Sequence, residues 1–279
     1  MSDINHNHQK KIAAINDYSG FGRCSMAVEL PVISQMRIQC CPLPTSIFSN
    51  HTGFPHFFFD DYTDKMESYI AQWKLLGLRF SGILTGFLGS ERQISIVQDF
   101  IRDFRDENTL VVVDPVMGDN GRPYSTYNDQ LCRAMGRLTS YADILIPNVT
   151  EACILTDTPY KASGWTRAEL FTMAKKLCQS GAGHIVISGV DMGQYIGNVV
   201  YEQGKSPCIL RTKRVGHTRS GTGDIFAAVI AADCVNGADL KSTVTKAGLF
   251  IKKCIAATEK MDIPFTDGVC FEEVLHELH

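Results

Sequence analysis

The sequence contains no long run of apolar residues, and this absence argues against a membrane-spanning helix. Its most apolar stretch, residues 225–235, follows directly on Asp224 and contains Asp233, whereas a helix that crosses a bilayer needs about 18 or more apolar residues in a row. The N-terminal segment also lacks the apolar core of a secretory signal. We therefore expect a cytoplasmic protein that does not bind membranes.

Charge of one sign is not concentrated anywhere in the chain. The 279 residues include 27 Lys and Arg and 30 Asp and Glu, which gives a formal net charge of −3. Proteins that bind nucleic acid carry Lys and Arg clustered on one surface, and no such run stands out here. The sequence therefore argues against nucleic acid as a partner.

Cysteine pairs at the spacing of redox or zinc motifs are missing, although the chain has ten cysteines. There is no CxxC or CxxxC pair, and most cysteines lie in apolar stretches, so we expect reduced thiols and no disulfides. Internal repeats and linkers rich in Pro, Gly and Ser are missing as well. This pattern predicts a single domain over residues 10–279, preceded by a disordered polar tail over residues 1–9.

Short apolar runs alternate with longer segments of helical period along the rest of the chain. The runs at residues 12–15, 82–87, 110–114, 142–148 and 184–189 are almost continuously apolar, as in strands that are buried on both faces. The expected helices lie at residues 24–36, 60–76, 90–105, 166–180, 223–235 and 240–258. This order predicts a three-layer α/β/α sandwich around a mostly parallel central sheet, which residues 40–49 and 195–212 extend or flank as hairpins.

A glycine-rich segment leads directly into an apolar helix. It reads Gly216-His-Thr-Arg-Ser-Gly-Thr-Gly-Asp224, and exposed N–H groups at a helix N-terminus bind phosphate well. Gly216 and Gly221 have the spacing of a P-loop, but Thr222 stands where its lysine is required, which excludes a Walker site. Asp224 has two interpretations: a base that accepts the proton of an attacking hydroxyl group, or an acidic residue that merely complements the helix dipole.

Two further loops place carboxylates after predicted strands. Asp114-Pro-Val-Met-Gly-Asp119 follows one strand, at the end of the sheet where open α/β proteins bind ligands, and Mg²⁺ commonly takes one or two carboxylates together with phosphate oxygens. Asn148 and Glu151 follow the next strand, and both could face the same cleft. They could equally form a capping box at the start of a helix.

The loop after the first strand contains Gly20-Phe-Gly22, a spacing that is shared with dinucleotide-binding proteins. The third glycine of that fingerprint is missing, so an NAD-dependent dehydrogenase is only the lesser alternative. Asp17 and Ser19 in this loop, together with the polar and aromatic residues 48–54, suit the binding of a flat polar ring.

Five ordered motifs resemble those of pyridoxal kinases in the ribokinase superfamily, and the resemblance extends from about residue 12 to the C-terminal helices. They are Phe48-Ser-Asn-His-Thr52, Leu84-Thr-Gly-Phe87, Asp114-Pro-Val-Met-Gly-Asp119, Pro147-Asn148-Val-Thr-Glu151 and Gly221-Thr-Gly-Asp224. The resemblance implies a ribokinase-like fold and ATP-dependent phosphorylation of the 5′-hydroxymethyl group of pyridoxal, pyridoxine or pyridoxamine. It also implies Mg²⁺, often K⁺, and a homodimer.

The resemblance further implies a role for each matching residue. Asp224 would accept the hydroxymethyl proton, and Asp119 and Glu151 would hold Mg²⁺ directly or through water. The anion hole for the transferred phosphoryl group would consist of Gly221, Thr222 and Gly223. The nucleotide and the monovalent ion would lie against Asp114, Asn148, Ser188, Val215, Gly216 and His217. The B6 ring would contact Asp17, Thr52 and Phe87.

Two positions depart from the better-known members of that family, which carry Ser where Asp17 stands and Tyr where Phe87 stands. A carboxylate at position 17 could accept a hydrogen bond from the ring or pair with the amine of pyridoxamine. Hydroxymethylpyrimidine kinases are the main alternative, although they usually carry Cys in place of Asp224 and lack the Ser-Asn-His-Thr segment. A non-catalytic nucleotide-binding protein would be expected to have lost one of these acidic residues.

Overall fold

The computed structural model describes residues 6–124 and 126–278, and their strands form one large sheet and one small hairpin. In the large sheet the strands are ordered β11-β10-β9-β8-β5-β4-β1-β2-β3. Their bounds are β1 (Lys11–Ser19), β2 (Gln39–Phe48), β3 (Phe59–Asp61), β4 (Gly82–Thr85), β5 (Leu110–Val113), β8 (Ile144–Leu145), β9 (His184–Met192), β10 (Tyr195–Glu202) and β11 (Cys208–Lys213). Strands β6 (Gly118–Asp119) and β7 (Arg122–Pro123) pair with each other.

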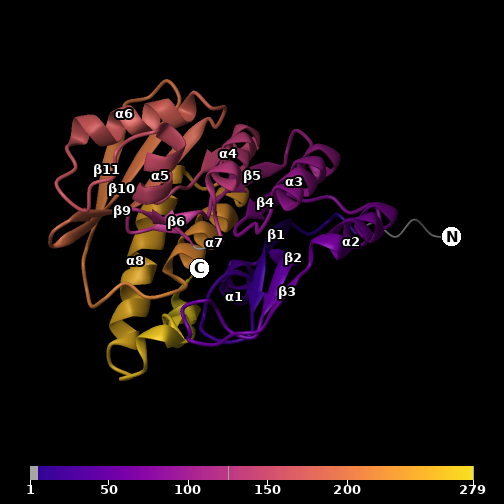
Figure 1. The fold of residues 1–279 in the computed structure, drawn as a ribbon, viewed down its shortest axis with the longest axis horizontal. Coiled ribbons are helices and arrows are strands. Elements are labelled where there is room, and N and C mark those ends of the chain that lie inside the picture. The colour runs from indigo at the N-terminus through magenta and orange to yellow at the C-terminus, as the bar shows by residue number, and fades with distance from the viewer. Residues whose placement is uncertain (1–5, 125, 279) are drawn as a thin grey trace.

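Helices cover both faces of the large sheet, which confirms the predicted three layers (Figure 1). One face carries α2 (Thr63–Leu75), α3 (Glu91–Phe104), α4 (Asp129–Leu138), α5 (Val149–Thr156) and α6 (Arg167–Cys178). The other carries α1 (Met26–Gln35), α7 (Thr222–Val235) and α8 (Leu240–Thr258). Short 3₁₀ helices lie at η1 (Thr139–Tyr141), η2 (Phe265–Asp267) and η3 (Phe271–Glu277).

The central strand β1 shows why the apolar runs are continuous. Ala13 and Ile15 belong to the core under α2 to α6, whereas Ile12 and Ala14 belong to the core under α1, α7 and α8. All four side chains are completely buried. A strand that is covered on both faces has no solvent-facing positions, so the polar alternation of a half-exposed strand is lost.

Two predicted segments differ from the structure in detail. Residues 195–212 form the expected antiparallel pair β10 and β11, but residues 40–49 form β2, which lies parallel to β1 and is not a hairpin by itself. Pro42 and Pro44 are tolerated there because β3 pairs with β2 only from Ser46 onward, so the prolines have a strand neighbour on one side only. Residues 60 and 61, which we expected at the start of a helix, belong to β3 instead.

The structure also bears on the predictions for the N-terminal tail, the cysteines and membrane-spanning helices. Residues 1–5 of the predicted tail lie outside the described residues, and Asn7 exchanges hydrogen bonds with the backbone of Gly77 and Arg79. All ten cysteines are free thiols, as expected. Over residues 6–124 and 126–278, no helix is both long and apolar enough to cross a membrane.

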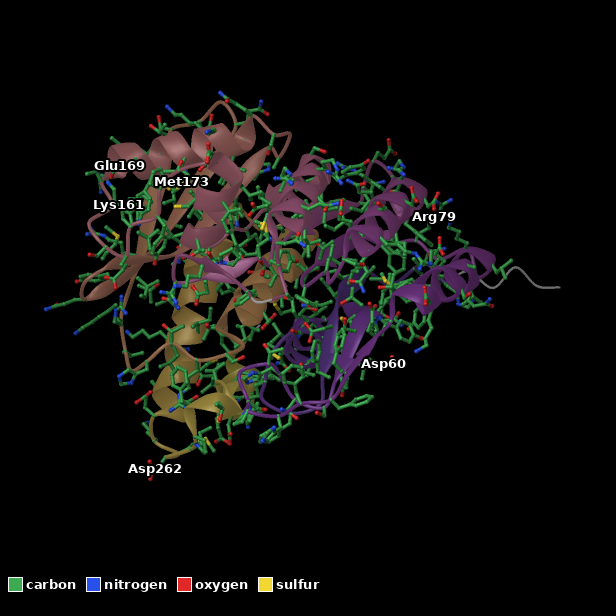
Figure 2. The ribbon with its side chains drawn as sticks, viewed as in Figure 1. Asp60, Arg79, Lys161, Glu169, Met173 and Asp262 are labelled. Atoms are coloured by element: carbon green, nitrogen blue, oxygen red, sulfur yellow. The ribbon has the colours of Figure 1, made fainter. Side chains whose placement is uncertain are left out.

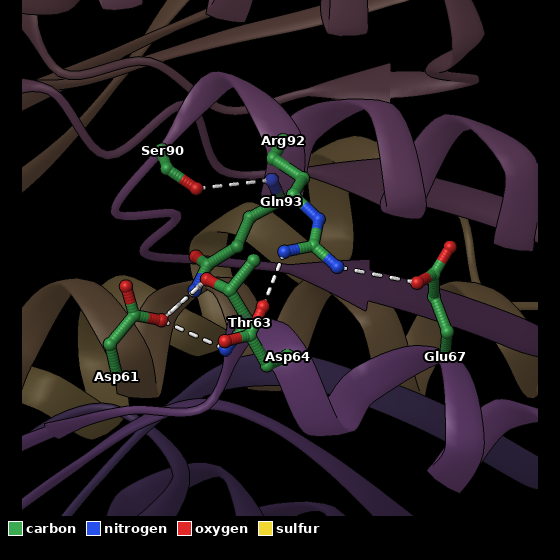
Figure 3. A network of polar contacts seen from close by, with 7 residues as sticks. All are labelled: Asp61, Thr63, Asp64, Glu67, Ser90, Arg92 and Gln93. Atoms are coloured by element: carbon green, nitrogen blue, oxygen red, sulfur yellow. Dashed lines mark hydrogen bonds and ion pairs between the residues drawn. The ribbon is translucent and has the colours of Figure 1, made fainter.

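Gln93 of α3 joins three segments at the β2 edge of the sheet (Figure 3). Its completely buried amide group donates to the carbonyl oxygen of Thr45 on β2 and to the hydroxyl group of Thr63 on α2, both at 2.8 Å. Its carbonyl oxygen accepts the N–H of Gly89 at 2.7 Å. On the same helix Arg92 is exposed and pairs with Asp64.

Replacing Gln93 by Leu is expected to destabilise the protein strongly. The substitution removes the hydrogen bonds of Gln93 to the Thr45 carbonyl, the Thr63 hydroxyl group and the Gly89 N–H, and each bond lost costs about 0.5–1.5 kcal/mol. Urea-induced unfolding monitored by circular dichroism measures the loss. Arg92→Ala is the matched control, and its midpoint should stay near that of the parent because exposed ion pairs are screened by solvent. Equal midpoints for Gln93→Leu and the parent would contradict this account.

Candidate active site

A cleft of about 970 Å³ opens where the parallel strands end. It collects loops that are far apart in sequence, because the carboxyl ends of parallel strands meet at one edge of a sheet. Thirteen of the sequence-predicted site residues line it, namely Asp17, Thr52, Phe87, Asp114, Asp119, Asn148, Glu151, Ser188, Val215, Gly221, Thr222, Gly223 and Asp224. Gly216 and His217 are not among the lining residues, since Gly216 packs against Glu259 and the His217 side chain is exposed.

The N-terminus of α7 presents free backbone N–H groups to this cleft. Gly221 is the N-cap residue with φ 90°, and no side chain caps the helix. A Cβ atom at Gly221 would lie 2.5 Å from the carbonyl oxygen of Arg23, so only glycine fits between this turn and the loop after β1. The first turn is therefore uncapped and can donate to an anion.

Asp224 lies in the first turn of α7 and lines the same cleft. Burial raises the pKa of its carboxyl group, whereas a backbone hydrogen bond from Ser25, the Asn16 side chain and the charge of His51 oppose the rise. A carboxylate that is desolvated beside an anion-binding turn is a stronger proton acceptor than one in water. The arrangement is that of a general base.

Asp17 is 6% exposed and lies at the end of β1. Its two oxygens accept hydrogen bonds from the hydroxyl groups of Ser25 at 2.6 Å and Ser19 at 3.1 Å. Burial and the charge of Asp224 nevertheless raise the pKa of Asp17 to about 6. Ser25 has a left-handed φ of 52°, which is strained for serine and typical of residues held in place at functional sites.

Asn148 and Glu151 form a capping box at the start of α5, the second of the two interpretations that the sequence left open. The Glu151 carboxylate accepts the N–H groups of Asn148 at 2.8 Å and Met117 at 3.0 Å. The Asn148 side chain accepts the Glu151 N–H and donates to the Gly118 carbonyl. Glu151 thus holds the β5–β6 loop against α5, and both residues still face the cleft.

Asp114 and Asp119 border the same loop. Burial and the charges of Glu151, Asp224 and Glu29 raise the pKa of Asp114 well above its usual range. Asp119 is exposed, and its carboxylate accepts two hydrogen bonds from Asn120. No group of three or more His, Cys, Asp or Glu side chains in the described part of the chain has the arrangement of a metal site. A divalent cation here would therefore depend on water and phosphate oxygens for most of its ligands.

One part of the cleft lining, called the basic wall below, consists of five cationic side chains. They come from the α5–α6 connection, from the end of β11 and the segment after it, and from α8. They are Lys161, Lys213, Arg214, Arg219 and Lys252. Figure 2 shows Lys161 close to Glu169 of α6, with which it pairs. A cleft with one basic wall and an uncapped helix N-terminus is suited to a polyphosphate.

Several residues of the site were missed by the sequence analysis. His51 lines the cleft, and its ring is fixed because Nδ1 accepts the N–H of Gly53 at 3.0 Å while Nε2 donates to the Thr266 carbonyl at 2.8 Å. Its place inside a conspicuous polar segment was a signal that could have been used. Arg219, which lies inside the glycine-rich segment 216–224, and Trp165 also line the cleft, and no motif marks Trp165.

Comparison with known proteins agrees with this geometry. A family model described as phosphomethylpyrimidine kinase matches residues 32–266. The chain is 24% identical to a pyridoxine/pyridoxal/pyridoxamine kinase of Bordetella avium, over 90% of this chain and 86% of that protein. It is 27% identical to the thiamine biosynthetic bifunctional enzyme TH1 of Arabidopsis thaliana, of which it spans 44%.

Solved structures are similar over almost the whole chain. A Bacteroides thetaiotaomicron protein, assigned provisionally as a phosphomethylpyrimidine kinase, has a TM-score of 0.95 and 40% identity over 99% of this chain and 96% of that one. A second crystal form of that protein contains pyridoxal. Pyridoxal kinase from Lactobacillus plantarum has a TM-score of 0.89 and 28% identity over 97% of this chain and 96% of that one. The chain therefore belongs to the phosphomethylpyrimidine kinase family and is, within it, a pyridoxal kinase of the ribokinase-like superfamily.

Proposed function

We propose that this chain transfers the terminal phosphoryl group of ATP to the 5′-hydroxymethyl group of pyridoxal, pyridoxine or pyridoxamine, with Asp224 as the base. The observation that carries the proposal is the position of Asp224, a half-buried carboxyl group that lines the cleft beside the uncapped turn of α7. Phosphoryl transfer requires mainly positioned groups and charge stabilisation, and both are available at this turn.

In this proposal each wall of the cleft has its own task. The basic side chains bind the phosphates of ATP, and the N–H groups of Gly221, Thr222 and Gly223 stabilise the phosphoryl group in transfer. The proton of the substrate hydroxyl group passes to Asp224 while its oxygen bonds to the γ-phosphorus. The bond from that phosphorus to the bridging oxygen breaks, and ADP leaves. Asn148 and Ser188 stay predicted neighbours of the nucleotide, as do Val215, Gly216 and His217.

The vitamer ring lies, in this proposal, between Asp17 and the aromatic residues Phe48 and Phe87. The two phenyl rings lie edge to face, with their centroids 6.4 Å apart. Thr52 also lines the cleft. The Asp17 carboxylate would accept a hydrogen bond from the ring nitrogen or ring hydroxyl group, or pair with an amine.

The acidic residues present fit Mg²⁺. Glu151 is buried and Asp114 is half-buried. Desolvation and the charge of Glu151 raise the pKa of Asp114, and a cation beside the two groups would relieve their repulsion. Asp119 would hold the ion directly, and Glu151, whose oxygens already accept backbone N–H groups, would act through water. When bound, Mg²⁺ neutralises phosphate charge. A K⁺ ion near Asp114 and Ser188 and a homodimer stay predictions of the resemblance. A cytoplasmic location and a single domain stay predictions of the sequence composition.

The family match favours a second candidate, the phosphorylation of hydroxymethylpyrimidine. A coupled ADP-release assay with pyridoxal, pyridoxine, pyridoxamine and hydroxymethylpyrimidine distinguishes the two. We expect ADP release with at least one B6 vitamer at a higher kcat/KM than with the pyrimidine. Release with the pyrimidine alone would replace the proposal by the second candidate, and release with none of the four would contradict both.

Asp224→Asn is expected to lower kcat by about 10²–10⁴-fold, the usual worth of general base catalysis. ATP should bind equally well or better, because the repulsion between the carboxylate and the γ-phosphate is removed. Steady-state kinetics and calorimetric titration with ATP measure the two effects. The matched control is Asp233→Asn on the same helix, where Asp233 pairs with Lys246 and turnover should stay near that of the parent. A normal kcat in Asp224→Asn would remove the proposed base.

Asp17→Asn is expected to stabilise the protein at pH 7 and to weaken vitamer binding. Burial raises the pKa of Asp17 from 3.8 to about 6 in the folded state. Ionisation of Asp17 therefore lowers the free energy of unfolding: the loss is absent below about pH 4 and complete above about pH 6. At pH 7 the variant should therefore have a higher melting temperature than the parent, and its free energy of unfolding should be larger by up to about 3 kcal/mol. At pH 3.5 the two proteins should melt alike. Differential scanning calorimetry at both pH values, with vitamer KM values, checks this. Unchanged KM values for all vitamers would show that Asp17 does not contact the ring.

Asp119→Asn and Glu151→Gln should separate metal binding from folding. Asp119 is exposed, so its replacement should raise the Mg²⁺ concentration for half-maximal activity without changing the melting temperature. Glu151 caps α5, so its replacement should lower the melting temperature of the ligand-free protein, an effect that the sequence alone did not predict. A Mg²⁺ requirement that is unchanged in Asp119→Asn would exclude direct binding by Asp119.

A further inference from the structure

The turn that joins β1 to α1, residues 20–25, has a strained backbone. Arg23 and Ser25 both adopt a left-handed conformation, with φ values of 36° and 52°, which residues other than glycine rarely adopt. Such conformations persist only where the surrounding structure holds them, and they gather at functional sites. Some contact must therefore keep this turn in place.

The turn fixes a residue of the proposed vitamer site. The hydroxyl group of Ser25 donates to the Oδ1 atom of Asp17 at 2.6 Å, and both Cys24 and Ser25 line the cleft. Asp17 is the carboxyl group that the proposed function assigns to the vitamer ring. A shift of the turn would therefore remove one of the two hydroxyl groups that hold this carboxyl group.

The turn is packed between α7 and a segment near the C-terminus. The carbonyl oxygen of Arg23 lies against Gly221, as described for the cleft. The second neighbour is Gly268, where a Cβ atom would lie 2.9 Å from both the Cβ atom of Arg23 and the carbonyl oxygen of Gly22. Such a close approach fits the backbone of the C-terminal segment against the turn at the point where the strain lies.

The Arg23 side chain anchors the turn to that C-terminal segment. Its Nε atom donates to both carboxylate oxygens of Glu272, at 2.8 and 2.9 Å, and its Nη1 atom donates to the carbonyl oxygen of Asp267 at 3.0 Å. Arg23 is not one of the described residues that line the cleft. It can therefore act on a substrate only through the residues that it positions.

The same segment, residues 264–272, is bound by two further loops of the site, and we call it the C-terminal clasp. His51 donates from Nε2 to the Thr266 carbonyl oxygen at 2.8 Å. Arg219 donates from Nη1 to the Pro264 carbonyl oxygen at 2.9 Å. Because side chains from separate loops hold it, the clasp is a fixed point of attachment for Arg23.

We propose that Arg23 is a positioning residue: its side chain fastens the strained turn to the C-terminal clasp and thereby keeps the Ser25 hydroxyl group on the Asp17 carboxyl group. The consequence for vitamer binding rests on the proposed function, in which Asp17 contacts the ring. The anchoring of the turn is a property of the fold, and it can be measured without substrate.

Amide hydrogen exchange in the ligand-free protein, followed by mass spectrometry, tests the anchor directly. The N–H groups of Gly20, Val28 and Glu29 are hydrogen-bonded at the two ends of the turn. In Arg23→Ala, peptides over residues 20–29 should exchange about tenfold faster or more, because the turn keeps its strain and loses its attachment. Glu272→Gln, which changes an exposed side chain, should show a smaller increase. Unchanged exchange in Arg23→Ala would overturn the inference.

Kinetics give the second readout. In Arg23→Ala the KM for the vitamers should rise about tenfold, because a small misplacement of a binding group is costly, while the Kd for ATP should stay near that of the parent. Arg23→Lys keeps the charge but not the planar fork of donors, so its KM should lie between the two. The double variant Arg23→Ala/Ser25→Ala should bind vitamers no more weakly than the more affected single variant. Multiplicative losses would overturn the inference.

Arg105→Ala is the matched control for simple destabilisation. Arg105 makes the same kinds of contact near the amino ends of the strands, away from the cleft: it pairs with Asp143 at 2.6 Å and donates to the Tyr141 carbonyl oxygen at 3.0 Å. Both Arg→Ala variants should lower the melting temperature by a similar amount, but only Arg23→Ala should raise the vitamer KM. An equal rise of KM in the two variants would overturn the inference.

Further outcomes separate this inference from the proposed function. If Arg23→Ala does not fold, Arg23→Lys and Glu272→Gln still decide, since both must speed exchange in the turn and raise the vitamer KM. A vitamer KM that is unchanged in Arg23→Ala but raised in Asp17→Asn would overturn the inference. If neither variant changes KM, or if the parent shows no turnover, the proposed function is contradicted, and hydrogen exchange still decides whether Arg23 anchors the turn.

Discussion

Repulsion among buried carboxyl groups is the constraint on which the rest of this site depends. Asp224 raises the pKa of Asp17, Glu29 and Asp114, and the pKa of Glu29 is itself raised by Asp17, while Glu29 raises that of Asp114. Packing like charges into a desolvated cleft is costly, so the surrounding structure has to offset that cost group by group. Hydroxyl groups bind Asp17, a backbone hydrogen bond from Ser25 lowers the pKa of Asp224, and the Asn16 amide donates to Glu29. The negative charge that these contacts do not neutralise is available to a cation or to a hydrogen-bond donor on the substrate ring.

The core on both faces of the sheet contributes enough to the free energy of unfolding to offset the cost of such a cleft. The sheet is packed on both faces, and strands such as β1 and β5 are buried along almost their full length. Burial of apolar surface contributes about 25 cal/mol per Å², so a core of this size tolerates a few unfavourable carboxyl groups at one edge. The strain at Ser25 and the close approach at Gly221 are concentrated at the same edge. The apolar core thus stabilises the fold, while the strained and charged residues lie together at the carboxyl ends of the strands.

The sequence predicted the layers and most of the site, but not its internal contacts. Apolar runs located the central strands because burial on both faces leaves a simple pattern. The segments after those strands contained Asp17 and Asp114, and the glycine-rich segment contained Asp224. The sequence did not predict α4, and of α5 it indicated only a possible start, since α5 is only eight residues long and its first turn was also consistent with a ligand-binding loop. The double role of Glu151 was likewise undecidable, because a capping box and a metal site use the same residue types at the same spacing.

The contact between Gly221 and Arg23 has a consequence for how the protein is made. A turn near the end of the chain lies on the carbonyl group of Arg23 near its beginning, and Arg23 also pairs with Glu272 and donates to the carbonyl group of Asp267. During synthesis the loop after β1 leaves the ribosome long before its partners, while the core under α2 to α6 can already condense. Until residues 221–272 arrive, that loop and the acidic pocket that it borders have nothing to close against. The phosphate-binding turn is therefore among the last parts of the molecule to form, and a nascent chain holds no completed site.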